Sequence, residues 1–298
     1  MSQIEPYLQP NWDWRAAGNF IGGGSGTGLA IIAAFAWLAG MPYWPIIALS
    51  MVLVGIGLVC VWLEIGRPWR ALHVFFHPET SWMTREAFVS LPFFALALLA
   101  GGSNFMSGFP AWIEGSLVFL TAVIAVVYLF CQAHILFASK GIPAWRDKGI
   151  LALIISTGIA EGAALVAFYV YLSNINYYWI AIFIIVSSLV RGVSWFHYYS
   201  RLKENRAPKK AIEALRICDL SAFLAGGLVP IAAAGAVLYL GNSYVWPLSI
   251  AGAASLLAGW HLKFTIIAKA AFNQGFALPK LPVRGAGKVS GSAKPGWD

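Results

Sequence analysis

Two acidic side chains, Glu64 and Glu86, frame the part of this sequence in which chemistry is easiest to place. The segment between them reads EIGRPWRALHVFFHPETSWMTRE and is rich in arginine, histidine and tryptophan. Glu64 ends one apolar stretch and Glu86 opens the next, so we expect both carboxylates at the same depth on adjacent antiparallel helices. Such carboxylates can accept and release protons, which suits coupled transfer of protons and electrons. An ordinary interfacial belt is the alternative, because Trp, Tyr and Arg also gather at membrane surfaces.

A second pair of ionisable residues lies inside apolar stretches. Glu161 falls about 12 residues into one of them, roughly 18 Å deep at about 1.5 Å per residue, and Arg191 lies in the next. An unpaired charge is costly inside a membrane, so we expect these two residues to pair. A structural ion pair and a proton path both remain open.

The first apolar stretch carries a stripe of glycines, in the sequence NWDWRAAGNFIGGGSGTGL. Its small-xxx-small spacings are typical of close helix packing. A flat groove beside Asn19 that holds an aromatic ligand is the other interpretation. A phosphate-binding loop is excluded, because no strand pattern precedes the glycines and no Gly-Lys-Ser/Thr follows them.

The cysteines and histidines argue against a metal centre held by this chain alone. The three cysteines are far apart and form no CxxC motif, which excludes a disulfide scaffold and a self-contained iron–sulfur or zinc site. A b-type haem needs two histidine ligands between helices. His261 lies securely within an apolar stretch, whereas His134 and His197 fall at helix ends. We therefore expect neither haem nor metal in this chain.

Membrane-spanning helices must position these residues. Of the 298 residues 59% are hydrophobic and 11% are charged, whereas a soluble domain carries about 25% charged residues. Disordered and nucleic-acid-binding chains are excluded too, since they are rich in charge and poor in apolar runs. Residues 1–14 contain no Lys or Arg, so the first stretch is expected to be a true helix and not a secretory signal.

Eight stretches are long enough to cross a bilayer as helices. They are residues 16–39, 42–65, 86–100, 111–132, 149–172, 176–197, 220–240 and 245–270. The sequence therefore predicts an all-α polytopic membrane protein whose eight helices form two four-helix bundles. The membrane domain spans residues 16–270, between an N-terminal segment (1–15) and a C-terminal tail (271–298).

The basic residues predict the orientation of these helices. All 20 Lys and Arg residues fall on one side of the predicted topology, if Arg191 is assigned to the inner half of its helix. The loops near residues 40, 101–110, 173–177 and 241–244 have none. The positive-inside rule makes the charged side cytoplasmic, with both termini there. Topology thus explains the net charge of +8 without a nucleic-acid partner.

The segment between the two glutamates also carries a family motif. GRP at residues 66–68 with Arg70, followed by SWM at 81–83 and RE at 85–86, resembles the NrfD-like membrane anchors of polysulfide reductase and DMSO reductase. Eight spans agree with the DMSO-reductase-type branch. The resemblance implies a bacterial inner-membrane subunit that anchors a molybdopterin catalytic subunit and a four-cluster iron–sulfur subunit. It also implies electron exchange with ubiquinone or menaquinone, no haem or cluster in the anchor, and no activity of the chain alone on a soluble substrate.

The resemblance assigns roles to individual residues. Glu64 occupies a quinone-site position where relatives often have histidine, and Glu86 matches the acidic residue that opens the next helix. Both are expected to handle protons. Arg67 and Arg70 match basic positions that orient the headgroup or meet the partner. The remaining residues of the expected quinone site are Asn19, Trp14 and Trp82.

The orientation separates this chain from relatives that dock their catalytic subunits outside the cytoplasm. A catalytic module on the basic side would be cytoplasmic, as in cytoplasmic sulfite dehydrogenase or phenylacetyl-CoA:acceptor oxidoreductase, and the opening NWDWRAA resembles the latter group. Two other functions remain open. One is a secondary transporter with a midplane site at Glu161 and Arg191, and the other is a haem-carrying electron-transfer subunit.

Overall fold

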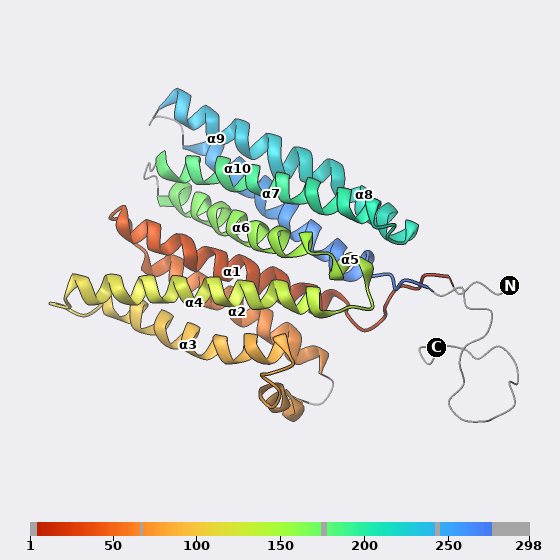
Figure 1. The fold of residues 1–298 in the computed structure, drawn as a ribbon. Helices are drawn as coiled ribbons and strands as arrows, with labels where there is room; N and C mark the ends of the chain where they lie inside the picture. The colour runs from red at the N-terminus through yellow and green to blue at the C-terminus, as the bar shows by residue number, and fades with distance from the viewer. Residues whose placement is uncertain (1–4, 66–67, 174–177, 242–244, 276–298) are drawn as a thin grey trace, which may run out of the picture.

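The computed structural model describes residues 5–65, 68–173, 178–241 and 245–275. Within these ranges the chain is helical and contains no strand, apart from an isolated antiparallel bridge between Leu8 and Phe272. Eight helical spans in the described part are long and apolar enough to cross a membrane. The all-α, eight-span prediction is therefore confirmed (Figure 1).

The eight spans pack as two rings of four helices, one above the other in Figure 1. The first ring consists of α1 (Trp14–Leu38), α2 (Trp44–Glu64), α3 (Trp82–Ser103) and α4 (Ala111–Ala138). The second consists of α6 (Gly149–Ser173), α7 (Tyr178–Glu204), the composite span α8 (Lys209–Phe223), η2 (Leu224–Leu228) and α9 (Val229–Leu240), and α10 (Trp246–Phe264) with η3 (Thr265–Lys269). In each ring every span packs on the next, and the last returns to the first. The short helices η1 (Pro68–Phe75) and α5 (Pro143–Arg146) connect spans at one end.

Helix α1 lies at the centre because its glycines let other backbones approach closely. A Cβ atom on Gly26 would lie 2.8 Å from the Ser50 carbonyl oxygen of α2, and Ser50 Oγ donates to the Gly26 carbonyl at 2.6 Å. On another face, a Cβ on Gly28 would overlap the Gly158 carbonyl of α6, and one on Gly162 would overlap Gly28. The glycine stripe therefore serves close helix packing, as one of the two interpretations predicted.

Two spans start earlier than their apolar runs. Helix α3 begins at Trp82 because Ser81 caps it, its hydroxyl accepting the Thr84 N–H at 3.3 Å. The seventh span begins at Lys209, so its polar first turns extend beyond the apolar stretch that starts near residue 220. Apolar length locates the part of a helix that suits the bilayer, whereas caps and polar turns decide where the helix itself begins.

The structure corrects the expected pairing of Glu161 with Arg191. Glu161 Oε2 pairs instead with Lys263 Nζ at 2.6 Å, and both side chains are fully buried. Arg191 donates to the Ser255 carbonyl at 2.8 Å and to the Gly226 carbonyl in η2. The prediction was wrong because it assigned Lys263 to the charged surface, whereas α10 carries this residue into the helix bundle. Lys263 and Arg191 are both buried there, so neither counts toward the charged side.

The other described basic residues gather at the end where α1 begins, which we call the basic end. They are Arg15, Arg70, Arg85, Lys140, Arg146, Lys148, Arg201, Lys203, Arg206, Lys209, Lys210, Arg216 and Lys269. Segments from both ends of the chain also meet at this end. The Gln9 N–H donates to the Ala271 carbonyl at 3.1 Å, and the Asn273 N–H donates to the Tyr7 carbonyl at 2.8 Å.

Candidate functional site

A cavity opens at the basic end of the first ring, between α1, α2, α3 and α4. Its volume is about 200 Å³. The lining residues are Trp12, Ala16, Asn19, Phe20, Val61, Glu64, Ile65, Met83 and Ile135. Most of these side chains are apolar, with a carboxyl from Glu64 and an amide from Asn19 among them. An apolar cavity of about 150 Å³ is enough to hold benzene, so this one has room for a ring-sized headgroup.

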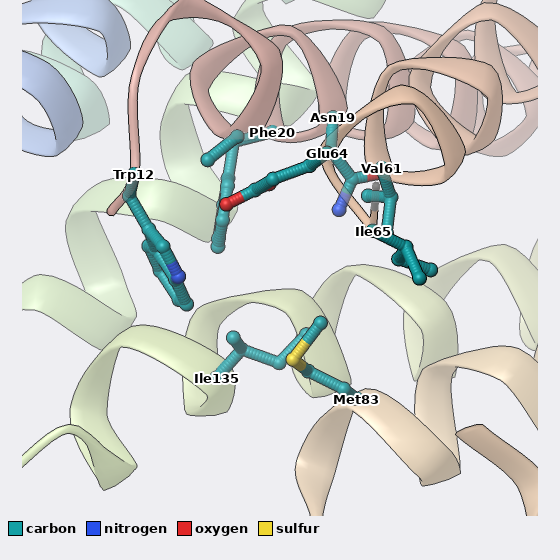
Figure 2. Close-up of a pocket in the computed structure, with 9 residues that line it drawn as sticks. Trp12, Asn19, Phe20, Val61, Glu64, Ile65, Met83 and Ile135 are labelled. Carbon is teal, nitrogen blue, oxygen red and sulfur yellow. The ribbon is translucent and has the colours of Figure 1, made fainter. Parts of the chain in front are cut away.

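Glu64, the last residue of α2, supplies the carboxyl group of the cavity. Figure 2 shows this carboxyl extending into the space between α1 and the helices that carry Ile135 and Met83. The guanidinium of Arg15 lies near enough to attract it, and Arg15 also donates to the Leu63 carbonyl at 2.9 Å. This hydrogen bond holds the end of α2 beside the first turn of α1 and so positions the backbone of Glu64.

Asp13 holds Arg15 in this position. Its carboxylate caps α1 by accepting the Arg15 backbone N–H at 2.8 Å, and it pairs with the Arg15 guanidinium at 2.9 Å. These hydrogen bonds, chiefly those from the Arg15 side chain, keep the pKa of Asp13 below its ordinary value. Asp13 therefore stays ionised at neutral pH and neutralises the Arg15 cation.

One wall of the cavity is a rigid aromatic surface. Trp12 stacks on Trp145 of α5 with ring centroids 4.8 Å apart. The ring centroid of Phe20 lies 6.1 Å from that of Trp12. Gln9 fixes the backbone of Trp12 in both directions, donating to its carbonyl at 2.8 Å and accepting its N–H at 2.7 Å. Trp145 donates in turn to the Ile266 carbonyl at 2.9 Å. The second ring thus supports a wall of the cavity in the first.

Glu86 lies behind this cavity and does not line it. Its side chain is only 4% exposed, and its Oε1 accepts a hydrogen bond from Gln132 Nε2 at 3.3 Å. The same Gln132 nitrogen donates to the Asn19 carbonyl at 3.0 Å, and the Asn19 side chain borders the Glu86 carboxyl. Glu64 and Glu86 therefore lie at the same end of the ring, as expected, with Asn19 between the cavity and Glu86.

The other residues assigned from the resemblance lie outside the lining of the cavity. Trp14 is 59% exposed, and Arg70 is exposed on η1. Trp82 packs against His134 with ring centroids 4.3 Å apart, while its neighbour Met83 faces the cavity. Arg67 lies outside the described residues. Roles for these side chains in binding a quinone stay predictions.

Sequence reasoning missed several residues that shape the site. Trp14 was assigned to the expected quinone site and Trp12 was not. Asp13 lies between them as the N-cap of α1, so Trp14 belongs to the helix and Trp12 to the segment before it. Gln132 carried a visible signal, because an amide inside an apolar stretch needs a hydrogen-bonding partner. The apolar lining residues Phe20, Met83 and Ile135 carried none, since their side chains resemble those of any packed helix.

The buried charges of the second ring surround little space. The cavity beside Arg191 measures about 10 Å³, too small for a transported solute in this conformation. His261 Nδ1 lies 3.0 Å from Ser221 Oγ and 3.9 Å from Cys218 Sγ. Among the described residues no group of three or more His, Cys, Asp and Glu side chains is placed to hold a metal ion.

Comparison with known protein families gives a match over most of the chain. Residues 20–262 match the family model described as DMSO reductase anchor subunit (DmsC). No curated protein matches the chain. The matched region contains Glu64, Glu86 and Gln132, and it reaches from the first turns of α1 to the last turns of α10.

Proposed function

The chain belongs to the DMSO reductase anchor subunit family, and we propose that it is the quinone-reactive subunit of a membrane-bound oxidoreductase complex. In this role it passes electrons between an iron–sulfur subunit and the quinone pool of the membrane. The iron–sulfur subunit in turn serves a molybdopterin catalytic subunit, which acts on the soluble substrate. The anchor by itself acts on no soluble substrate.

The cavity at the basic end of the first ring is the observation that carries this proposal. A quinone has a flat apolar ring with two carbonyl oxygens, and the cavity offers an aromatic wall at Trp12 and Phe20 with polar groups at Asn19 and Glu64. Ligand sites of this kind are mostly apolar, with a few polar groups that fix orientation. The Asn19 amide can donate to one quinone carbonyl, and the Glu64 carboxyl faces the other in the bound state.

Quinone reduction adds two electrons and two protons, and quinol oxidation releases them. The electrons come from, or return to, the cluster of the iron–sulfur partner. Glu64 is half-buried at the end of its helix, so it can exchange protons with both the ring and the solvent at the basic end. Glu86 provides a second proton-accepting carboxyl behind Asn19.

The basic end is the proposed docking face for the iron–sulfur subunit, because electrons must enter close to the cavity. The positive-inside rule makes this face cytoplasmic, with both chain ends on the same side of a bacterial inner membrane. The catalytic subunit would then work in the cytoplasm, which favours the branch that includes phenylacetyl-CoA:acceptor oxidoreductase and cytoplasmic sulfite dehydrogenase.

Purification from the native membrane tests the anchor role directly. The tagged chain, extracted in mild detergent, should bring with it a molybdenum- or tungsten-containing subunit and a cysteine-rich, ferredoxin-like subunit. Both should lack export signals if the basic end is cytoplasmic. A chain that purifies alone and transports a solute in vesicles would contradict the proposal.

Glu64→Gln tests the quinone site within the assembled complex. Removing the proton-accepting group should lower turnover with a short-chain quinone about 100-fold, the lower end of what general acid–base catalysis contributes. The subunits should still co-purify, because Gln has nearly the same shape. The matched control is Glu79→Gln, since Glu79 is exposed in the same connecting segment and does not line the cavity. Equal turnover of the two variants would rule out the assigned role of Glu64.

A further inference from the structure

A cluster of buried polar side chains joins the two rings behind the cavity. It consists of Glu86 on α3, Gln132 on α4, Glu161 on α6 and Lys263 on α10, all packed around the glycine-rich part of α1. Gln132, Glu161 and Lys263 are fully buried, and Glu86 is 4% exposed. The proton chemistry proposed for the cavity leaves the ion pair of this cluster without a role.

The ion pair is held in a fixed position. Lys263 Nζ contacts Glu161 Oε2 at 2.6 Å, and Ser25 Oγ donates to the same carboxylate oxygen at 2.7 Å. Trp260 Nε1 donates to Ser25 Oγ at 3.0 Å, which fixes the hydroxyl. Breaking a buried pair from one side leaves an uncompensated charge. Lys263 and Glu161 therefore compensate each other's charge in this region.

Gln132 lies between the Lys263 cation and Glu86. A Cβ atom on Gly24 would overlap Lys263 Nζ and would lie 3.4 Å from Gln132 Oε1, so the ammonium group and the amide oxygen face the same side of Gly24. The other end of the amide, Nε2, donates to Glu86 and to the Asn19 carbonyl. A backbone carbonyl can only accept, so this bond defines which end of the amide faces Glu86.

We propose that the Lys263–Glu161 pair is a positioning element for Glu86 and acts through the amide of Gln132. The proposal rests on the proposed function in assigning Glu86 to the quinone site. The Lys263 cation attracts the carbonyl end of Gln132 and thereby directs the NH₂ end toward Glu86. In that orientation Gln132 stabilises the ionised carboxylate, because hydrogen bonds to the charged form favour it.

The reverse orientation of the Gln132 amide would favour the protonated form of Glu86. The amide oxygen would then face Glu86 and could accept a hydrogen bond from the acid O–H. Rotation of the amide would then direct its NH₂ group at the Lys263 ammonium, two donors facing each other. The ion pair thus opposes proton uptake by Glu86 and favours proton release from it, so a charge held by the second ring biases a carboxyl of the first.

The other ionisable groups around Glu86 do not replace this link. Tyr128 and Cys131 face it from α4, and both are neutral at neutral pH. From α1 it meets the uncharged Asn19. Arg85, its neighbour on α3, is engaged elsewhere, donating to the carbonyls of residues 78 and 79 at 2.8 Å. Glu64 at the end of α2 lines the cavity on the other side of Asn19.

Infrared difference spectroscopy on the full chain in lipid nanodiscs tests the proposal without quinone or partner subunits. The carbonyl stretch of protonated Glu86 is titrated against pH and identified by its loss in Glu86→Gln. The double variant Glu161→Gln with Lys263→Met removes both charges together, so no unpaired charge is left buried. We expect it to raise the midpoint pH of the Glu86 band by about one unit, because the Gln132 amide is then free to turn and Glu86 loses a hydrogen bond that favours its ionised form.

Gln132→Met is the second variant and keeps the ion pair intact. It should shift the midpoint in the same direction, because Glu86 loses the donor. Adding the double variant to Gln132→Met should then produce little further shift, as a double-mutant cycle requires for a shared path. The matched control removes another ion pair, Asp147→Asn with Arg201→Met, and should leave the midpoint unchanged.

The results that would contradict the coupling differ from those that would contradict the quinone site. An unchanged midpoint in either Gln132→Met or the double variant overturns the coupling, and so does a full additional shift when the two are combined. The pH profile of quinone turnover in the assembled complex then tests the proposed function on its own. A shifted infrared midpoint together with no quinone turnover by the wild-type complex would refute the quinone site and leave the coupling standing.

Discussion

The two rings of this protein present different structures at the same end. In both rings the first and third spans begin at the basic end, and the second and fourth spans end there. The first ring has an apolar cavity at that position, lined by small and apolar side chains around Glu64. In the second ring Tyr198 is fully buried there, and Trp195 stacks on Tyr199 with ring centroids 5.3 Å apart.

The charged residues at the two positions differ as well. A polar cleft of about 410 Å³ lies at the basic end of the second ring, and its lining includes Arg146, Lys148 and Arg201. Its carboxylate, Asp147, is saturated with donors, among them Arg201 Nε at 3.0 Å and the Gly149 N–H at 2.8 Å. A carboxylate so well bonded stabilises the fold. The Glu64 carboxyl instead extends into a cavity.

The arrangement of the helices therefore does not by itself create the cavity. Both rings have the same order of packing, yet the side chains leave an apolar cavity in the first ring and a polar cleft lined by charged residues in the second. The small side chains of Ala16 and Asn19 on α1 face the cavity. Four substitutions test this difference.

Gly28→Leu would break the contact on which the comparison depends, because it forces apart the central helices of the two rings. The added side chain would overlap the Gly158 carbonyl, so the free energy of unfolding should fall by about 1–3 kcal/mol or more. Thermal unfolding in detergent measures this loss. Gly55→Leu is the control, since nothing lies within 4 Å of a Cβ at that position. Equal stability of the two variants would show that the rings do not pack as described.

Ala16→Phe would make the first ring resemble the second by filling its cavity. Turnover of the assembled complex with a short-chain quinone should fall at least tenfold, about 1.4 kcal/mol in binding, while partner subunits remain bound. Ala207→Phe places the same side chain in the polar cleft of the second ring and should leave turnover unchanged. If both variants reduce turnover equally, the cavity is not where the quinone binds.

Trp12→Leu tests the contribution of the aromatic wall to quinone binding. Loss of the stacked indole should raise the KM for quinone several-fold with little change in kcat, because aromatic pairs contribute about 0.5–1.5 kcal/mol beyond their buried area. Steady-state kinetics of the complex separate the two constants. Trp14→Leu is the matched control, since Trp14 is exposed and does not line the cavity. A larger effect of Trp14→Leu would instead support the role assigned to it from the resemblance.

Asp13→Asn should have the smallest effect, a slight loss of thermal stability at neutral pH. The pKa of Asp13 is lowered in the folded chain, so its ionised form stabilises the fold above the ordinary value of 3.8. That contribution disappears as the pH falls through the lowered pKa. Unfolding temperatures of the two proteins should therefore differ at pH 7 and converge in strong acid. A difference that persists in acid would show that the ionised carboxylate is not the cause.

The eight spans, the basic end and the position of Glu64 at the end of a helix could all be predicted from the sequence. These features depend on the lengths of apolar runs and on the order of charged segments, which are local properties of the chain. Only part of the lining of the cavity could be predicted in this way. Glu64 and Asn19 were both expected and both line the cavity, because each lies at a helix end or a glycine-rich face that the sequence marks.

Which side chains contact one another depends instead on how the helices pack. Each residue along a helix turns by about 100°, so the direction of Lys263 or Gln132 depends on how α10 and α4 are rotated against their neighbours. The partner of Glu161 therefore could not be read from adjacent spans, and the nearest opposite charge in sequence, Arg191, was the wrong one. The choice of Trp12 over Trp14 likewise depends on Trp145, a residue more than 100 positions away, against which the indole stacks.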